Sequence, residues 1–474
     1  MTGPAAQDAL ATAAAVRAGT VSAVEVAAAH LDRSARLGPV VGAFARLTPE
    51  IALAQAAAID AAVARGEVSA PLLGVPCPIK DLTPVATVGW EAGSAAMRGN
   101  VADVDDDIVG WLADAGTVMT GKTATPEFGL PCYTEPDTGP ARTPWDLSLS
   151  AGGSSGGAAA AVATGLAPIA HASDGGGSIR IPASACGLVG LKASRGRISG
   201  GRLRMPGPGL GTDGVLSRTV ADTAVALDVL AGHGLGETFS VTGPGSTFLA
   251  AAGREPRRLR VGVLTTPVIA EADVHPACLE AVRATAAALA ALGHDVAEAP
   301  VPFAVDRWEA FGAIWAVGAA SIPLPEQAGP LLRPLTRWLR ERGNRTSGVD
   351  YAAALGAVQR LTVDTALAWD GFDVILTPTL AQPPALVGEL RNDDDPAADF
   401  AAQTRFTPWT SVYNLTGLPA ISLPLHTADV DGRTLPIGVM LGGRLGAEET
   451  LLSVSAQLED AVGWQHPFLA QDPA

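Results

Sequence analysis

The chain has 474 residues, of which 48% are hydrophobic and 17% charged, a globular composition with enough apolar residues for a large core. Its 32 basic and 48 acidic residues give a formal net charge of −16, which argues against nucleic acid or an anionic membrane as a partner, because both bind basic surfaces. Four widely spaced cysteines form neither a metal-ligand pattern nor a disulfide framework, and we expect no metal ion and no cofactor.

The sequence shows no pattern typical of a membrane-spanning helix or an export signal. No apolar run approaches the roughly 18 residues that a membrane helix needs. The first residues, MTGPAAQDAL, contain neither a basic nor an apolar region of the kind an export signal has. We therefore expect a cytoplasmic protein.

The first half of the chain is mostly helical in pattern. Two Ala-rich helices are predicted within 5–35, split by a turn in which Ser22 is a candidate N-cap. The segment 129–155 has no periodicity and is predicted to be a long ordered loop. The other predicted elements are helices over 48–65, 105–115 and 158–165, a buried strand over 117–120, a short apolar segment over 188–191, and an amphipathic helix over 218–232 closed by Gly232.

The second half mixes strands and helices. Residues 259–300 read as strand, helix and strand, a βαβ pattern, and 303–365 is predicted to be mostly helical. The remaining predicted elements are short strands over 373–377, 420–424 and 437–441 and a last helix over 447–462. The sum is an α/β protein with a mixed sheet. Candidate linkers at 233–257 and 390–398 do not clearly divide two cores.

Two glycine-rich turns present hydroxyl groups. The run GGSSGG places Ser154 and Ser155 just ahead of a predicted helix, and DGGGSIR places three glycines before Ser178. Glycine allows close backbone approach, and the N–H groups of the second turn can converge as an oxyanion hole. The first run also matches the G-x-S-x-G elbow of α/β-hydrolases. We disfavour that interpretation, because the preceding segment is a poor strand and no downstream histidine has a supporting motif.

Lysine usage suggests a base for such a serine. Only three of the 32 basic side chains are lysines: Lys80, Lys122 and Lys192. A guanidinium stays charged, whereas burial favours the neutral form of an amine, which can accept a proton. Lys80 follows an apolar segment and is the first candidate. Lys122 and Lys192 are competitors, and either can instead form a structural ion pair.

Taken together, the motifs resemble those of the amidase signature family. They are GVPCPIKDL, GKTATPEFG, GGSSGG, DGGGSIRIPAS and GLVGLKASRGRIS, with DVILTPT, NLTGLPAISLP and LPIGVMLGG toward the C-terminus. The resemblance spans roughly residues 5–465. The stretches YTEPDTGPARTPWD and IAHASDGGGSIRIPAS look most like the subgroup that includes 6-aminohexanoate cyclic dimer hydrolase and related bacterial amidases and urethanases.

This resemblance implies a fold and an activity. The fold is a single domain over 1–474, with a central, mixed, twisted β-sheet covered by α-helices on both faces. Its catalytic core spans about 70–232, and a helical segment at about 300–365 lies on the substrate side. The activity is hydrolysis of the C–N bond of neutral amides, anilides or carbamates through an acyl-enzyme, with esters as side substrates.

The resemblance also assigns roles to residues. Ser178 is the nucleophile, Ser154 follows a cis peptide bond and relays the proton, and Lys80 is the base. The N–H groups of Gly175, Gly176, Gly177 and Ser178 form the oxyanion hole. Ser155 is expected to hydrogen-bond Lys80, or simply to cap a helix, while Asp174 and Arg180 fix the nucleophile turn.

Substrate-side residues are assigned less directly. Leu130, Pro131, Cys132 and Tyr133 are expected beside Ser154 by resemblance to the acyl-site segment. The loop 199–214 reads as a mobile lid or as a plain surface loop, and Trp315 and Trp409 as pocket walls or as core packing. The chain departs from the usual family residues at Gly175 (Thr), Ala124 (Asn), Ala193 (Pro) and Met440 (Gln), which bears on specificity and stability.

Two other functions compete with the amidase. A glutamyl-tRNA amidotransferase A-type subunit shares the triad but works in a complex that binds tRNA, and the net charge of −16 weighs against it. A non-catalytic scaffold would not need Lys80, Ser154 and Ser178. The expected partner is a small amide or carbamate, and the sequence leaves a homodimer open.

Overall fold

A mixed β-sheet of eight strands runs through the computed structural model, which describes residues 7–203, 207–232, 237–464 and 466. The strands are β4 Ile169–Asp174, β5 Val189–Lys192, β6 Thr212–Ser217, β7 Arg260–Val263, β8 Asp295–Glu298, β9 Val374–Pro378, β10 Ala420–Val430 and β11 Arg433–Gly443. Their order across the sheet is β4-β6-β5-β10-β11-β9-β7-β8. The β9–β7 and β7–β8 pairs are parallel and the other neighbours are antiparallel.

A second, smaller sheet carries the first candidate lysine. It consists of β1 Phe44–Leu47, β3 Gly121–Thr123 and β2 Ile79–Lys80, in the order β1-β3-β2. Strand β2 is parallel to β3, with Lys80 opposite Thr123. Both residues of β2 are buried, so the Lys80 side chain starts inside the protein.

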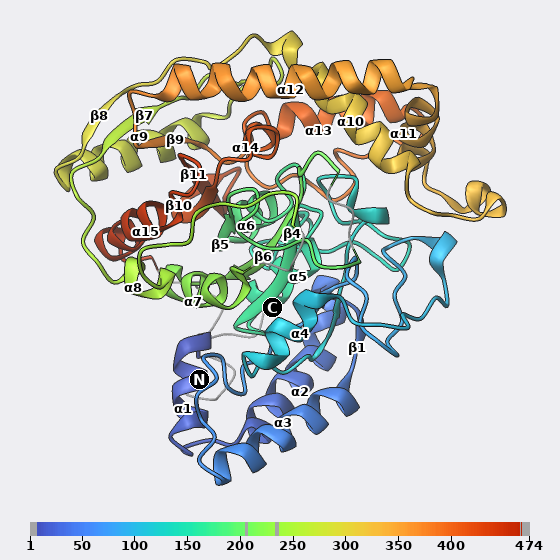
Figure 1. Cartoon of the computed structure of the whole chain (residues 1–474), viewed down its shortest axis with the longest axis vertical. Coiled ribbons are helices and arrows are strands. Elements are labelled where there is room, and N and C mark those ends of the chain that lie inside the picture. Colours follow the sequence, from blue (N-terminus) through green and yellow to red (C-terminus); the bar gives the residue numbers. More distant parts are fainter. Residues whose placement is uncertain (1–6, 204–206, 233–236, 465, 467–474) are drawn as a thin grey trace.

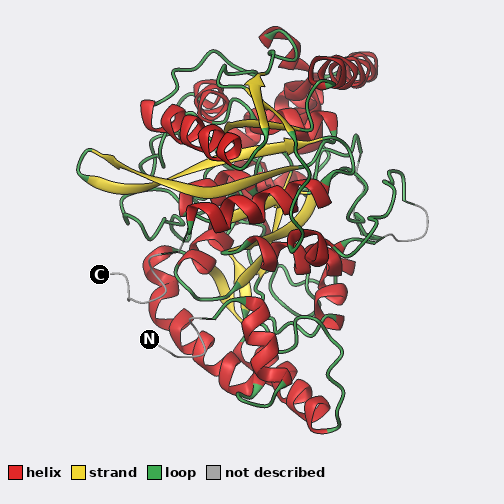
Figure 2. Ribbon diagram, turned by 90° about the vertical axis from the view of Figure 1, so that its left-hand side faces the viewer, coloured by secondary structure: helices red, strands yellow, loops and turns green. Residues whose placement is uncertain are grey.

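Helices surround the strands, and in Figure 2 they lie both above and below them. They are α1 Ala9–Arg17, α2 Ala23–Val41, α3 Pro49–Ala64, α4 Asp107–Asp114, α5 Gly156–Ala163, α6 Arg180–Cys186, α7 Val220–Leu230, α8 Phe248–Ala252, α9 Pro276–Ala291, α10 Glu309–Ala320, α11 Pro334–Arg345, α12 Gly348–Trp369, α13 Pro396–Phe406, α14 Thr410–Thr416 and α15 Glu448–Val462. Helices α1–α3 lie at one end of the molecule and α10–α13 at the other (Figure 1). The expected mixed α/β fold is confirmed. Within the described residues, no helix is both long and apolar enough to cross a bilayer.

Helix α5 positions the first serine turn because it consists of small residues. Every residue of Gly156–Ala163 is buried. A Cβ built on Gly157 would lie 2.3 Å from the Ala124 backbone nitrogen, so the helix packs too closely on the segment after β3 for a larger residue. Its N-terminus brings Ser154 and Ser155 next to the small sheet that carries Lys80.

Several predicted elements are confirmed. Ser22 caps α2 with a capping box in which Glu25 bonds back to the Ser22 backbone. The βαβ pattern is present, since β7 and β8 are parallel neighbours joined through α9.

Other element predictions were wrong or incomplete. Val118 makes only an isolated bridge with Pro76, and the predicted strand at 117–120 is replaced by β3 three residues on. Gly232 does not close α7, because the chain leaves the helix at Ala231 in an extended conformation. Strands β4 and β6 and helices α6, α13 and α14 were not predicted, and the candidate linker 390–398 runs into α13. Ala and Asp weaken the strand pattern of β4 and β6, and helices α6 and α14, of seven residues each, are too short to show a periodicity.

Candidate active site

The Lys80 amine lies at a pair of serine hydroxyls. The side chain is fully buried, and its Nζ donates to Ser154 Oγ at 2.8 Å and to Ser173 Oγ at 3.1 Å. A longer contact of 3.4 Å reaches the Ser173 carbonyl. Sequence reasoning identified Ser154 but missed Ser173, which lies at the end of β4 in the IAHASD segment.

The other two lysines are equally buried but have different partners. Lys122 Nζ lies 3.0 Å from Asp81 Oδ1 and donates to the Thr83 carbonyl, so it forms a structural ion pair. Lys192 Nζ donates to the carbonyls of Ala193 and Leu418. Burial, with the Arg180 charge as a second cause, lowers the pKa of Lys192 to about 7. Among the described residues, neither of these two amines donates a hydrogen bond to a serine hydroxyl. Lys80 is therefore the lysine that fits the predicted base.

The peptide group between Ser154 and Ser155 is hydrogen-bonded through both its carbonyl and its N–H. The Gly153–Ser154 peptide bond is cis, as the resemblance implied. The Ser154 carbonyl accepts from Thr125 Oγ1 at 3.1 Å, and the Ser155 N–H donates to the Ser178 carbonyl at 3.3 Å. Ser155 Oγ donates to the Ser173 carbonyl at 3.2 Å and makes no side-chain cap of α5. The turn with Ser154 is therefore bonded directly to the turn with Ser178.

A buried histidine lies behind the lysine backbone. The Lys80 N–H donates to His171 Nδ1 at 3.3 Å, and His171 Nε2 lies 3.0 Å from Asp213 Oδ1. Nδ1 is then the acceptor and Nε2–H the donor to Asp213. The sequence offered no supporting motif for His171, and its place here is to fix the end of β2.

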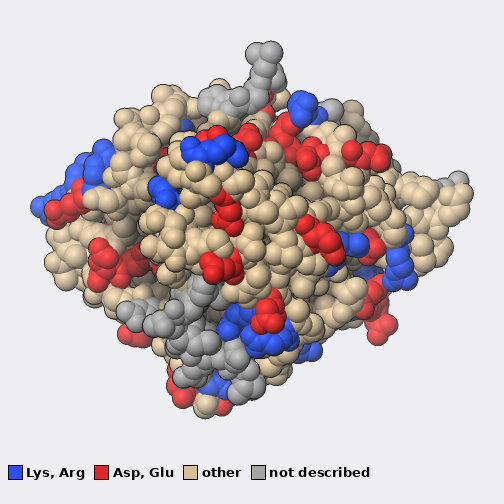
Figure 3. Space-filling view, turned by 90° about the horizontal axis from the view of Figure 1, so that it is seen from below, with Lys and Arg blue, Asp and Glu red and all other residues tan. Residues whose placement is uncertain are grey.

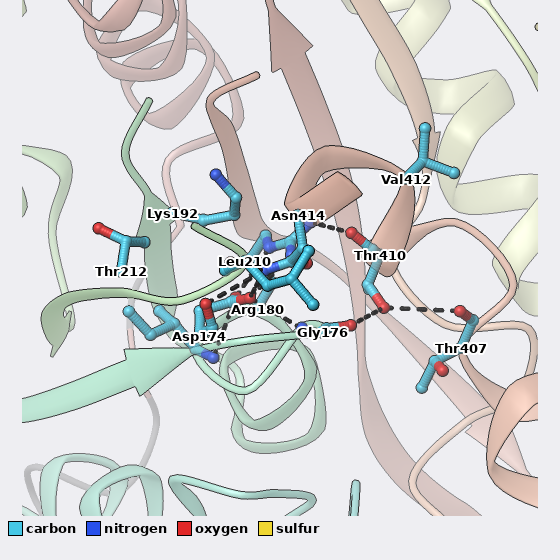
Figure 4. Close-up of polar contacts among 12 residues, drawn as sticks. Asp174, Gly176, Arg180, Lys192, Leu210, Thr212, Thr407, Thr410, Val412 and Asn414 are labelled. Atoms are coloured by element: carbon cyan, nitrogen blue, oxygen red, sulfur yellow. Dashed lines mark hydrogen bonds and ion pairs between the residues drawn. The ribbon is translucent and has the colours of Figure 1, made fainter. Parts of the chain in front are cut away.

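The Ser178 turn, between β4 and α6, is built around a buried ion pair. Arg180 makes two hydrogen bonds to Asp174, each 2.9 Å, and both side chains are fully buried (Figure 4). Burial alone raises the pKa of Asp174, but the Arg180 charge and the Asn414 amide outweigh it and hold this pKa well below its ordinary value. Asp174 therefore favours its charged form, and its two hydrogen bonds with Arg180 join the start of the turn to α6.

Helix α14 completes the support of this turn. Asn414 Nδ2 donates to Asp174 Oδ1 at 2.9 Å and to the Leu210 carbonyl at 3.0 Å. Thr410 Oγ1 donates to the Gly176 carbonyl at 2.7 Å (Figure 4). Sequence reasoning did not single out either residue, although Asn414 opens the quoted motif NLTGLPAISLP.

The amides of the turn divide into two groups. The Gly177 N–H donates to Asp174 Oδ1 at 2.8 Å, so it is committed inside the loop and does not fit the oxyanion role expected for it. Within the described residues the N–H groups of Gly175, Gly176 and Ser178 have no recorded acceptor. These three remain the candidate donors to an oxyanion.

Ser178 opens onto an apolar cavity of about 50 Å³. The walls are formed by the loop after β3, by α10 and by α13. Besides Ser178 and Gly176, the lining residues are Leu130, Pro131, Cys132, Ile181, Ile269, Trp308, Phe311, Trp315, Phe400, Gln403, Thr404, Thr407 and Ser411. Of the four predicted pocket residues, Leu130, Pro131 and Cys132 line this cavity, and so does Trp315.

The remaining predictions have other locations. Tyr133 is not among the lining residues, and its hydroxyl donates to the buried Asp399 at 2.8 Å. Trp409 is core packing, with Nε1 donating to the Thr266 carbonyl. Residues 212–214 of the proposed lid belong to β6, and residues 204–206 lie outside the described part of the chain.

Comparisons with known proteins agree with this geometry. The family profile named Amidase matches residues 25–452. A 6-aminohexanoate-cyclic-dimer hydrolase from Pseudomonas sp. strain NK87 is 37% identical over 97% of this chain and 95% of its own. A glutamyl-tRNA(Gln) amidotransferase subunit of the A type, from Acidothermus cellulolyticus, is 34% identical over 95% and 93% of the two chains. A solved 6-aminohexanoate cyclic dimer hydrolase with bound substrate superposes with a TM-score of 0.90 at 34% identity, covering 99% of both chains.

Proposed function

The chain belongs to the amidase signature family, whose hydrolases act on amide C–N bonds, and we propose that it cleaves neutral amides, anilides or carbamates through Ser178, Ser154 and Lys80. The observation that carries this proposal is the fully buried Lys80 Nζ, 2.8 Å from Ser154 Oγ, in a turn bonded to that of Ser178. Burial disfavours the charged form of an amine, and a neutral amine can accept a proton.

The proposed first half-reaction forms an ester. Lys80 takes a proton from the Ser154 hydroxyl while Ser154 takes one from Ser178, and Ser178 Oγ attacks the carbonyl carbon. The oxyanion accepts from amides of the Gly175–Ser178 turn. The C–N bond then breaks as the proton passes from Lys80 through Ser154 to the leaving nitrogen, which departs as the neutral amine.

The second half-reaction reverses these roles. Water gives its proton through Ser154 to Lys80 and attacks the ester, and the acid is released as Ser178 regains its proton. With a carbamate substrate the released acid is a carbonic half-ester, which decomposes to the alcohol and CO₂ without help from the protein. Each step uses only groups of this chain and water.

The test is a hydrolysis panel. It contains an aliphatic amide, an anilide, a cyclic amide and a carbamate, assayed with wild type and with alanine variants of Ser178, Ser154 and Lys80. We expect Ser178→Ala and Lys80→Ala to abolish turnover and Ser154→Ala to lower kcat by about 10²-fold or more. Ser148→Ala removes an exposed hydroxyl outside the site and retains wild-type rates.

The dependence of kcat on pH tests whether Lys80 acts as the base. A protonated amine cannot accept a proton, so kcat falls as the pH is lowered and Lys80 becomes charged. Turnover in Ser178→Ala, or a wild-type rate that stays flat down to about pH 5, contradicts the assignment.

A glutamyl-tRNA amidotransferase subunit is the alternative. Its relative is also similar over most of both chains, but at lower identity. On the face drawn in Figure 3, basic and acidic side chains are interspersed in small groups, without a continuous basic surface for tRNA. Glutaminase activity that requires ATP and copurifying subunits would favour this alternative over the stand-alone amidase.

A further inference from the structure

The turn before Ser178 packs against a ladder of aromatic rings at the start of α10. The ring centroids of Trp308 and Phe311 are 4.9 Å apart, and those of Phe311 and Trp315 are 5.2 Å apart. The interplanar angles of 19° and 18° make the three rings nearly parallel. The ladder lies on one helix face because its members recur at helical spacing.

A side chain at position 175 would press against the Trp315 indole. A Cβ built on Gly175 would lie 3.2 Å from both Cη2 and Cζ3 of the Trp315 indole. On Gly176 it would lie 3.4 Å from Phe311 Cζ. The backbone does not demand glycine at position 175, since its φ is outside the left-handed region that Gly177 adopts at +136°. The indole is therefore what a side chain at position 175 would meet, and it would have to shift by a few tenths of an ångström to admit one.

The first ring of the ladder, Trp308, borders two spaces of very different size. The cavity at Ser178 holds about 50 Å³, whereas a more open depression on the other side of Trp308 holds about 660 Å³. Trp308, Phe400 and Thr404 line both. Trp308 is fixed there by its Nε1–H, which donates to Ser411 Oγ at 2.9 Å. We call the larger space the vestibule.

The vestibule presents aromatic rings among charged side chains, because Glu271, Glu309, Arg342 and Arg405 also line it. Trp338 lines it, with its ring centroid 5.8 Å from that of Phe400. The Arg342 guanidinium lies over the Trp338 ring at 4.6 Å. The rings of Trp308, Trp338 and Phe400 favour a flat group, which gains buried area and ring contacts together.

The order of the proposed reaction assigns the two halves of a substrate. The amine leaves before water attacks the ester, so the amine half needs a way out, whereas the acyl half stays on Ser178. Resting on the proposed function, we infer that the cavity accepts only a compact acyl or alkoxycarbonyl group, that Trp315 sets this limit, and that the vestibule takes a large amine with a flat aromatic group.

Acyl length tests the role of Trp315. Acetyl, butyryl and hexanoyl 4-nitroanilides share one leaving group, and wild type should have a kcat/KM at least about tenfold higher for acetyl than for hexanoyl. Trp315→Ala should raise kcat/KM for hexanoyl by about tenfold relative to acetyl. Trp111→Ala, which removes another half-buried helical tryptophan on α4, is the matched control and leaves the acyl preference unchanged.

A double substitution tests the steric pair directly. Gly175→Thr collides with the indole and should lower kcat/KM for every acyl group, and it should be largely rescued in the Trp315→Ala background, because contacting residues are not additive. Circular dichroism and thermal melts establish that each variant is folded. If Gly175→Thr lowers kcat/KM equally in the wild-type and Trp315→Ala backgrounds, the proposed steric contact between position 175 and Trp315 is wrong. This comparison holds whatever the stability of Trp315→Ala.

Amine size tests the vestibule. N-methyl, N-benzyl and N-(2-naphthylmethyl) acetamides release aliphatic amines, so differences in leaving-group chemistry are small. We expect kcat/KM to rise along this series and Trp338→Ala to flatten the rise. A preference for hexanoyl substrates or for the methylamide, with turnover still dependent on Ser178, overturns this inference alone. Failure of every substrate in both series counts against the proposed function instead.

Discussion

At the scale of single residues, the Ser178 turn depends on a glycine that the backbone itself requires. Gly177 has φ +136°, and a Cβ there would lie 2.6 Å from both Thr410 Oγ1 and Ile181 Cδ1. Gly177→Ala should lower kcat by about 10²-fold or more, because the oxyanion donors move, and should cost about 1–3 kcal/mol of stability. Steady-state kinetics and urea unfolding measure the two effects.

Gly66→Ala is the matched control. Gly66 also has a positive φ, +81°, but a Cβ there would meet nothing within 4 Å. It should lose stability through backbone strain alone and keep the wild-type kcat. A Gly177→Ala variant with unchanged kcat would show that the turn tolerates a side chain and that its geometry is not what we describe.

Individual residues were predictable where the chemistry is local to a motif. Lys80, Ser154 and Ser178 each lie in a short run whose glycines or apolar neighbours mark them. Ser173, Thr410 and Asn414 were missed because their roles come from partners far along the chain, as when Asn414 bonds Asp174. The Gly177 amide was assigned wrongly, since nothing in three consecutive glycines tells which N–H turns inward to a carboxylate.

At the scale of elements, a buried and a half-buried carboxylate join α7 to its neighbours. Asp222 on α7 accepts from the Ala9 and Leu10 amides of α1, and Glu459 on α15 accepts from the Val220 amide of α7. Burial raises the pKa of Asp222 to about 6 and that of Glu459 to about 7. Folding therefore favours their protonated forms, and this stabilisation is fully present below about pH 4 and lost as pH rises to about 7.

A neutral substitute should remove that pH dependence. Glu459→Gln keeps an acceptor for Val220 and should raise Tm at pH 8, with a smaller gain at pH 5. Glu449→Gln on the same helix should do the opposite, because the Gly245 amide, Ser246 and Arg254 outweigh burial and lower the pKa of Glu449. Thermal melts at the two pH values measure both changes in Tm. A Glu459→Gln variant that is less stable than wild type at pH 8 would contradict a raised pKa for Glu459.

Elements were predictable where their pattern is self-contained. Helices α2, α3 and α9 have long runs of helix-forming residues, and β7 and β9 are apolar runs between turn signals. Strand β4 was missed because IAHASD mixes Ala, His and Ser, and it becomes a strand only by pairing with β6. Helix α6 holds seven residues, including Pro182, and no periodicity can be read over that length.

At the scale of the whole molecule, the site joins distant parts of the chain. Strands β10 and β11 lie between β5 and β9, so the C-terminal hairpin is inside the sheet that carries the Ser178 turn. Thr410 of α14 donates a hydrogen bond to that turn, and Trp315 of α10 packs against it. A catalytic core at 70–232 is therefore incomplete without residues 308–315 and 410–414, and we continue to expect one domain.

The fold class was predictable from alternating strands and helices, but the strand order was not. Adjacent strands such as β5 and β10 are separated by more than two hundred residues, and no local pattern specifies that pairing. The family resemblance supplied the architecture that periodicity alone left open.

Covalent labelling tests the central claim most directly. Wild type and alanine variants of Ser178 and Lys80 are treated with a fluorophosphonate, and the adduct is located by peptide mass spectrometry. The account predicts modification of Ser178, none of that peptide in Ser178→Ala, and labelling slowed by about 10²-fold or more in Lys80→Ala. An adduct on a different residue, or an unchanged labelling rate without the Lys80 amine, would contradict it.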